Sequence, residues 1–325
     1  MRALIITSLI SLLSPLILGQ NTIRFSNFNF TKSIYNPSAI ATDAQVSSDL
    51  VYRTQWVGLD GAPTTIGFNG GYEINELMAV GINFLNDRIG LNQTNSISAM
   101  YAYRLLFDDK QYLSFGLGVG VDNISWNLNE ATTIQANDAA FSTGYSTWAF
   151  NSSVGLYYKT KKFYAGISVP QMFQNTLFGQ DKGMKLIRFH YHALAGYHFS
   201  VSERFVFHPS LQLKYTWNAP IQGDAILRGI WSDLGFSLGY RSENSLIAGI
   251  DYTFGQKIRI GYMANYDLGP LARSKGWSHE VYLGLGLPYH NSNVGIDGRL
   301  YVNKKGGYKT NYRRSARRKQ SKRPY

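Results

Sequence analysis

Alternation of apolar and polar residues with a period of two, repeated along most of the chain, most constrains how this sequence can fold. Residues 111–123 place an apolar side chain at every second position and small or polar residues between them, and residues 205–217 repeat the pattern. Such a period puts alternate side chains on opposite faces of a β-strand. The apolar face is too continuous for contact with water, so we expect it to be covered.

About fourteen such runs can be marked along the chain. They are 47–57, 64–73, 77–86, 94–106, 111–123, 147–158, 162–169, 188–199, 204–217, 222–231, 233–241, 245–254, 257–266 and 277–287. Most are close to the about 9 to 11 residues that cross a bilayer when a strand is tilted. An even number of antiparallel strands can close on itself, which leaves no unpaired backbone groups in lipid.

The connections between these runs provide an independent argument. Every second connection is short, at Asn75, Asp108, Thr160, Val201, Ser232 and Gln256. The alternate set contains the long segments 124–146, 170–187 and 267–276. Short periplasmic turns that alternate with longer outer loops are typical of outer-membrane barrels, whereas a soluble β-sandwich has no reason to alternate. The sequence therefore predicts an all-β, transmembrane outer-membrane barrel of about 14 antiparallel strands.

Four segments follow from this pattern. Residues 1–19 resemble an export signal, since Arg2 precedes an apolar run that ends before Gly19; the alternative, a membrane anchor, would need about 20 apolar residues. Residues 20–46 are too aromatic for a free linker and too irregular for a wall strand, so we expect a plug or periplasmic cap. The barrel should occupy 47–287 and a C-terminal extension 288–325.

The formal charge of +12 is concentrated in that extension. Residues 303–325 hold ten Lys or Arg and no acidic residue, whereas residues 1–302 carry 22 basic and 20 acidic groups. An exported body that is nearly neutral gives no reason to expect nucleic acid as a partner. The basic tail could instead attract acidic lipid head groups, peptidoglycan or a periplasmic protein, or be a solvated end.

Catalytic and metal-binding patterns are weak. The chain has no Cys, and no Gly-x-Ser-x-Gly motif or paired carboxylates with a nearby base. His190, His192, His198 and His208 share the inward parity of their strands, which suits a polar lumen better than zinc, because no acidic ligand stands beside them. The glycines of 116–120 open no helix and fit small inward positions next to a plug better than a phosphate loop. We expect no enzyme activity, cofactor or metal.

Several short motifs in a fixed order carry a family resemblance over nearly the whole body. They are Phe25 to Phe28, Asn36-Pro37-Ser38-Ala39, Tyr52-Arg53-Thr54-Gln55-Trp56-Val57-Gly58-Leu59-Asp60-Gly61-Ala62-Pro63, Asn86 to Gly90, Tyr101 to Arg104, Gly166 to Pro170, Pro209 to Leu211 and Ser278-His279-Glu280. With these motifs the chain resembles the PorP/SprF family of outer-membrane proteins of the type IX secretion system of Bacteroidota. The basic extension departs from the family pattern.

The resemblance implies a protein that binds partners. Such proteins are needed for export or surface attachment of large adhesins that carry a type IX C-terminal domain, and some are linked to a periplasmic ring, to peptidoglycan-bound components or to gliding motility. The main rival is a FadL-like channel for hydrophobic small molecules, which also has fourteen strands and an N-terminal plug. A continuous apolar tunnel would favour the channel, and a polar, blocked lumen would favour the binder.

The candidate site is the outer rim of the barrel. Topology places residues 58–63 and 87–93 in outer loops, and strand parity directs Arg53 and Gln55 inward and Trp56 toward lipid or the interface. We expect Arg53, Gln55 and Asp60 to fix the first loop against the lumen and form a rigid mouth, unless they serve only barrel stability. The predicted site comprises Arg53, Gln55, Trp56, Asp60, Pro63, Asn86 and Asp87 at the rim and Asn36 and Pro37 in the plug.

Overall fold

A computed structural model of the chain describes residues 23–108, 111–128, 144–172, 189–202, 204–217, 219–269 and 276–287. The proposed export signal (1–19), the C-terminal extension (288–325) and most of the three long outer connections lie outside the described residues. Within them, no helix combines the length and hydrophobicity needed to cross a bilayer.

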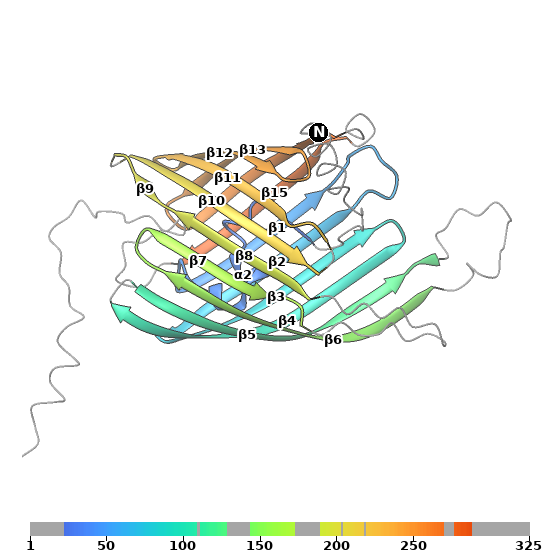
Figure 1. The fold of residues 1–325 in the computed structure, drawn as a ribbon, viewed down its shortest axis with the longest axis horizontal. Coiled ribbons are helices and arrows are strands. Elements are labelled where there is room, and N and C mark those ends of the chain that lie inside the picture. Colours follow the sequence, from blue (N-terminus) through green and yellow to red (C-terminus); the bar gives the residue numbers. More distant parts are fainter. Residues whose placement is uncertain are drawn as a thin grey trace, which may run out of the picture.

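The described residues form one antiparallel sheet that closes into a barrel (Figure 1). Its strands are β1 (Val46–Thr54), β2 (Thr64–Asn75), β3 (Met78–Ile89), β4 (Asn92–Asp108), β5 (Gln111–Trp126), β6 (Tyr145–Lys159), β7 (Phe163–Val169), β8 (His190–Tyr197), β9 (Phe199–Ser200), β10 (Phe205–Thr216), β11 (Gln222–Trp231), β12 (Leu234–Arg241), β13 (Ser245–Phe254), β14 (Ile258–Asp267) and β15 (Ser278–Leu287). Closure occurs between the first and last strands, with Val46 opposite Leu287 and Thr54 opposite His279.

The wall confirms the predicted fourteen-strand antiparallel barrel. β8 and β9 both pair with β10 and are separated only by His198, so together they make one wall strand. Each wall strand pairs with the next along the chain, and the connections therefore alternate between the two ends. The short even-numbered connections lie together at one end, which we assign to the periplasm.

Side chains alternate across the wall as the two-residue period predicts. On β13, Ile250 and Tyr252 are exposed to the outside while Asp251 and Thr253 are buried toward the lumen. The outward set is rich in Leu, Ile, Val, Phe and Tyr, as a surface in contact with lipid requires. The inward set is mainly polar or charged, because those side chains meet the interior segment instead of lipid.

Some strand ends differ from the prediction. β1 ends at Thr54 instead of residue 57, because Trp56 adopts a left-handed backbone conformation with φ of 49°. β4 and β5 extend to Asp108 and Trp126, beyond the predicted ends at 106 and 123. The conformation of the turn residues determines where each strand ends, and the alternation of apolar and polar residues does not show where a turn begins.

Residues 23–45 occupy the interior of the barrel and form its plug (Figure 1). The plug contains the short helix α2 (Lys32–Tyr35) and the 3₁₀ turn η1 (Pro37–Ala39). Its aromatic residues explain the irregular pattern of this segment, since they pack against wall residues from opposite sides of the barrel. The prediction left a plug or a periplasmic cap open, and the described residues form a plug.

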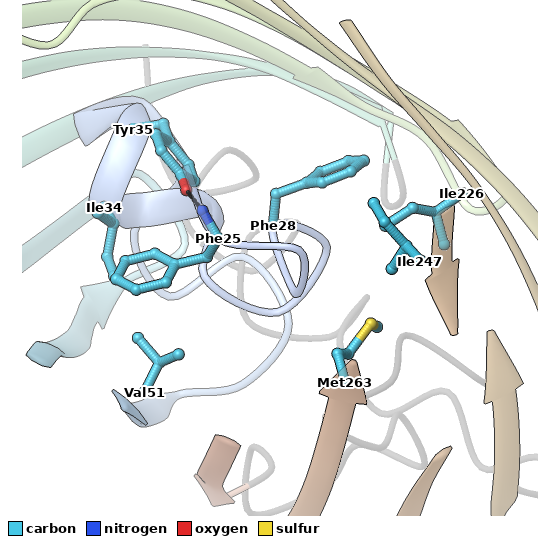
Figure 2. Close-up of a cluster of buried hydrophobic side chains, with 8 residues drawn as sticks. All are labelled: Phe25, Phe28, Ile34, Tyr35, Val51, Ile226, Ile247 and Met263. Atoms are coloured by element: carbon cyan, nitrogen blue, oxygen red, sulfur yellow. Dashed lines mark hydrogen bonds between the residues drawn. The ribbon is translucent and has the colours of Figure 1, made fainter. Parts of the chain in front are cut away.

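The main apolar core of the lumen lies between the start of the plug and the wall. It contains Phe25, Phe28, Ile34, Tyr35, Val51, Ile226, Ile247 and Met263. Figure 2 shows Phe25 beside Ile34 and Val51, whereas Phe28 extends toward Ile226. The backbone N–H of Phe25 donates to the Tyr35 hydroxyl over 2.6 Å, which folds the plug back on itself.

Small residues on the wall make room for the plug. A Cβ at Gly116 would overlap the backbone of Pro37 and Ser38, and a Cβ at Gly155 would overlap the Asn36 side chain. The predicted role of the glycines in 116–120, as small inward positions next to a plug, is confirmed for Gly116. Glycine is required here because the backbone of the plug touches the wall directly.

Candidate functional site

The loop between β1 and β2, residues 55–63, is the central part of the outer rim. Its two ends are joined by a hydrogen bond of 2.9 Å from the Gln55 N–H to the Pro63 carbonyl oxygen. Two internal bonds, from Leu59 N–H to Trp56 oxygen and from Ala62 N–H to Leu59 oxygen, are each 3.1 Å long. The loop is therefore a compact, internally bonded unit.

Two glycines permit this compact form. Gly58 and Gly61 have φ values of +99° and +69°, in the region that favours residues without a Cβ. These are two of the glycines in the motif that carried the family resemblance. The positive φ angles explain why glycine stands at these two positions of the motif.

Neighbouring loops hold the β1–β2 loop in place. The Val57 N–H donates to the Trp277 carbonyl oxygen over 3.0 Å, and the Gly90 N–H donates to the Gly61 oxygen over 2.9 Å. A Cβ on Gly276 would overlap the backbone of Val57. The outer rim is thus a platform made from the β1–β2 loop, the β3–β4 turn and the residues just before β15, joined through their backbones.

Of the three residues expected to fix the loop against the lumen, Arg53 and Gln55 contact each other. Arg53 is buried in the lumen wall, and its Nη2 donates to Gln55 Oε1 over 3.1 Å. Asp60 is exposed in the loop. Backbone hydrogen bonds hold the loop to its neighbours, and the role of Arg53, Gln55 and Asp60 in fixing it against the lumen stays a prediction.

Strand parity placed Trp56 toward lipid or the interface. The left-handed turn at this residue ends the alternation, and the ring lies partly buried with Nε1 donating to Asp267 Oδ2 over 3.2 Å. Asp267 also accepts a hydrogen bond from the Ser245 hydroxyl. Trp56 therefore joins the first loop to the ends of β13 and β14.

The second pair of predicted residues supports the rim from β3. The Asn86 side chain donates to Asn95 Oδ1 over 2.6 Å, and Asp87 accepts from the Thr65 hydroxyl over 2.7 Å. These bonds join β2, β3 and β4 just below the β3–β4 turn. Asn86 and Asp87 position the platform, and Pro63, which is buried, closes its base.

Exposed apolar side chains lie on this platform. Val57, Leu59 and Trp277, which we call the rim patch, are 49, 47 and 51% exposed. The Trp277 ring packs against Tyr266 with centroids 4.9 Å apart. A rigid backbone that presents apolar and aromatic side chains is the usual composition of a protein-binding surface. The sequence reasoning identified the loop but did not select Val57, Leu59 or Trp277.

The predicted plug residues anchor the interior segment. The Asn36 amide donates to the carbonyl oxygens of Leu156 and Ile167, over 3.0 and 3.4 Å, and its oxygen accepts from Ser38 N–H over 3.0 Å. Pro37 begins the 3₁₀ turn, where its missing N–H has no cost. Asn36 and Pro37 are therefore contacts between plug and wall, remote from the rim patch.

Charged residues that the sequence analysis did not select fix the two ends of the plug. At the outer end, Glu280 accepts the backbone N–H groups of Ser26 and Asn27, each over 2.8 Å, and Arg24 pairs with Asp224 and Glu243. The inward parity of Glu280 on the last strand is the signal that could have identified it. The plug residue it would contact could not be read from a strand pattern.

At the periplasmic end, the Asp43 carboxylate lies between two ammonium groups, with Lys32 at 2.7 Å and Lys159 at 2.6 Å. Burial alone would raise the pKa of Asp43, but Lys159 and Lys32 outweigh it and hold that pKa well below its usual range. Arg104 pairs with Glu73 and donates to the carbonyl oxygens of Ile40 and Ala41 over 2.9 and 2.8 Å. These contacts close the periplasmic end of the plug.

Charged side chains of the wall also contact the plug inside the described part of the lumen. The guanidinium groups of Arg228 and Arg259 lie over the ring of Phe30, 4.9 and 4.3 Å from its centroid. Asp251 accepts from Arg228 Nε over 2.8 Å. His192 and His208 are buried in this interior, and His192 stacks on Tyr35 with centroids 5.2 Å apart. Within the described part of the chain no group of three or more potential metal ligands is present.

Comparison with known proteins gives one family. The model of the family described as "Type IX secretion system membrane protein PorP/SprF" matches residues 17–285. A search of curated protein sequences gives no match.

Solved structures similar to the barrel are outer-membrane channels of low sequence identity. The CymD monoaromatic hydrocarbon channel is 12% identical with a TM-score of 0.48, and the alignment covers 84% of this chain and 96% of that one. The toluene transporter TodX of P. putida is 11% identical, with a TM-score of 0.46 and coverage of 79 and 94%. A FadL homologue of Pseudomonas aeruginosa is 9% identical, with a TM-score of 0.42 and coverage of 78 and 92%.

Proposed function

Because the chain belongs to the PorP/SprF family of type IX secretion system membrane proteins, and is thus an outer-membrane component of that system, we propose that its outer rim binds a secreted partner. The partner is an adhesin or other cargo protein that carries a type IX C-terminal domain, and the barrel anchors it or assists its export. If the adhesin is one used for gliding, the barrel contributes to gliding motility by anchoring or exporting it. The role is one of binding, without catalysis.

The rim patch is the observation that carries this proposal. Val57, Leu59 and Trp277 are each about half exposed although they stand on a backbone fixed by hydrogen bonds between loops. A surface that is ordered before binding loses little entropy when a partner docks. Asp60 beside the patch adds a charge that can orient the partner.

The rival function, a channel for hydrophobic molecules, needs an apolar path through the lumen. Here the described lumen holds the plug, and buried ion pairs at both ends of the plug surround it. An apolar solute would have to displace paired charges, which is costly in a medium of low dielectric constant. These contacts favour the binding function.

The test is co-purification from envelopes in mild detergent. We expect the wild-type protein to retain a secreted protein or its C-terminal domain. In the double variant Val57→Asp with Leu59→Asp, the amount of co-purified partner should fall at least about tenfold, because the new charges would be buried in the interface without a partner. Val201→Asp is the matched control, since Val201 is 69% exposed at a periplasmic turn. Equal loss in the control, or an apolar small molecule as the only bound species, would contradict the proposal.

A further inference from the structure

A pocket at the periplasmic mouth of the barrel has a composition unlike that of the outer rim. Plug residues Lys32 and Asp43 form one side of it. The other side comes from the end of β6 and the β6–β7 turn, with Lys159, Lys161 and Lys162, and from the wall residues His208 and Arg228. Lys161 and Lys162 are exposed on the turn, so the pocket is reached from the periplasm.

Positive charge is in excess in this pocket. Lys32 and Lys159 line it and share the carboxylate of Asp43, and Arg228 pairs with Asp251. Lys161 and Lys162 add two more cations at the opening. The lining therefore attracts an anion, and the low dielectric constant of the lumen strengthens that attraction relative to an open surface.

A buried imidazole gives a second, independent indication. His208 is 4% exposed and lines the pocket, and its Nδ1 has no hydrogen-bond partner among the described residues. Its Nε2 contacts the Tyr164 hydroxyl over 3.1 Å, and its ring stacks on His198 with centroids 4.0 Å apart. A buried nitrogen without a partner costs free energy, which a ligand oxygen would relieve.

We propose that this pocket binds a carboxylate presented by an acidic segment of a periplasmic protein. The pocket opens inside the barrel mouth, so the wall separates it from lipid head groups and a segment entering from the periplasm can reach it. Lys161 and Lys162 would contact the segment first, and the inner cations would hold its carboxylate. The inference relies on the proposed secretion role only for the place of the partner, and its test does not involve the rim.

The experiment uses the full-length protein in a neutral detergent and a photoreactive hexaglutamate peptide, with attachment sites mapped by mass spectrometry. We expect labelling to concentrate on residues 159–164. The double variant Lys161→Gln with Lys162→Gln should reduce that labelling about fivefold, because two charges at the opening are lost. It should fold normally, since both side chains are exposed.

Lys257→Gln is the matched control, because Lys257 is exposed on the β13–β14 turn at the same end of the barrel. It should leave labelling of 159–164 within twofold of wild type. Labelling confined to the basic C-terminal residues, or equal losses in both variants, would overturn the proposal. Loss of labelling when inorganic phosphate is added at the peptide's own concentration would identify a small anion as the occupant and overturn the assignment to a protein partner.

Discussion

The two ends of the barrel present different surfaces, although ion pairs hold the plug at both. At the outer rim, loops are joined by backbone hydrogen bonds, and apolar side chains are left exposed. At the periplasmic mouth, cations are in excess around the end of the plug. Backbone bonds fix shape without adding charge, which suits docking of an apolar surface, whereas ion pairs fix a segment only while both partners stay charged.

The largest effect should come from breaking the periplasmic end. Arg104→Met removes the ion pair with the buried carboxylate of Glu73 and the hydrogen bonds to the Ile40 and Ala41 oxygens. We expect a loss of about 3–5 kcal/mol in the free energy of unfolding, measured by urea titration in lipid vesicles. Arg88→Met removes the same charge at the exposed outer end and should change that free energy by less than about 0.5 kcal/mol.

A second prediction concerns the contact between plug and wall. Gly116→Ala would place a methyl group on the backbone of Pro37 and Ser38, and the plug must shift, at a cost of about 3 kcal/mol. We expect ion conductance in planar bilayers to rise above that of wild type. In Gly229→Ala the nearest atoms would lie 3.5 Å away, an ordinary contact, so its conductance should equal that of wild type. Equal conductance in all three proteins would show that the plug is not what closes the lumen.

The wall was predictable from the sequence because alternation follows directly from strand geometry. Successive side chains of a strand face opposite sides of the sheet, and accordingly Ile250 is exposed whereas its neighbour Asp251 is buried. The plug contacts were not predictable, since they join residues far apart in sequence, such as Ser26 with Glu280. The hydrogen bond from Trp56 to Asp267 was not predictable either, because a left-handed turn at Trp56 ends the alternation, and nothing in the periodicity marks that turn.

The rim patch was missed for a related reason. Leu59 and Val57 follow the residues that strand parity emphasised, and Trp277 lies in a distant segment. Their proximity depends on the bond from Val57 N–H to Trp277 oxygen, which exists only after β15 closes the barrel against β1. Local sequence can indicate a turn, but it cannot show which other loop the turn packs against.

A third prediction uses pH to separate the two ends. The pKa of Asp43 is lowered in the folded state, so its contribution to stability is complete above its unfolded pKa of about 3.9 and is lost as pH falls through the folded value. Asp43→Asn should therefore cost about 2 kcal/mol at neutral pH and show less acid destabilisation than wild type below about pH 4. Urea titrations in vesicles at several pH values would measure both. Parallel pH curves for the two proteins would contradict this account of Asp43.

The smallest effect on stability should come from a substitution in the outer rim, and we expect that effect to be confined to neighbouring residues. Gly61 has φ of +69°, and a Cβ there would lie 3.3 Å from the Gly90 Cα, so Gly61→Ala should cost about 1 kcal/mol. The cost should appear as faster hydrogen exchange at the Gly90 amide, which donates to the Gly61 oxygen, with unchanged exchange around Ile40. Gly269→Ala has no atom within 4 Å of its added Cβ and should leave both sites unchanged. If Gly61→Ala also speeds exchange at the plug, the rim and the periplasmic end are coupled, and they are not separately built surfaces.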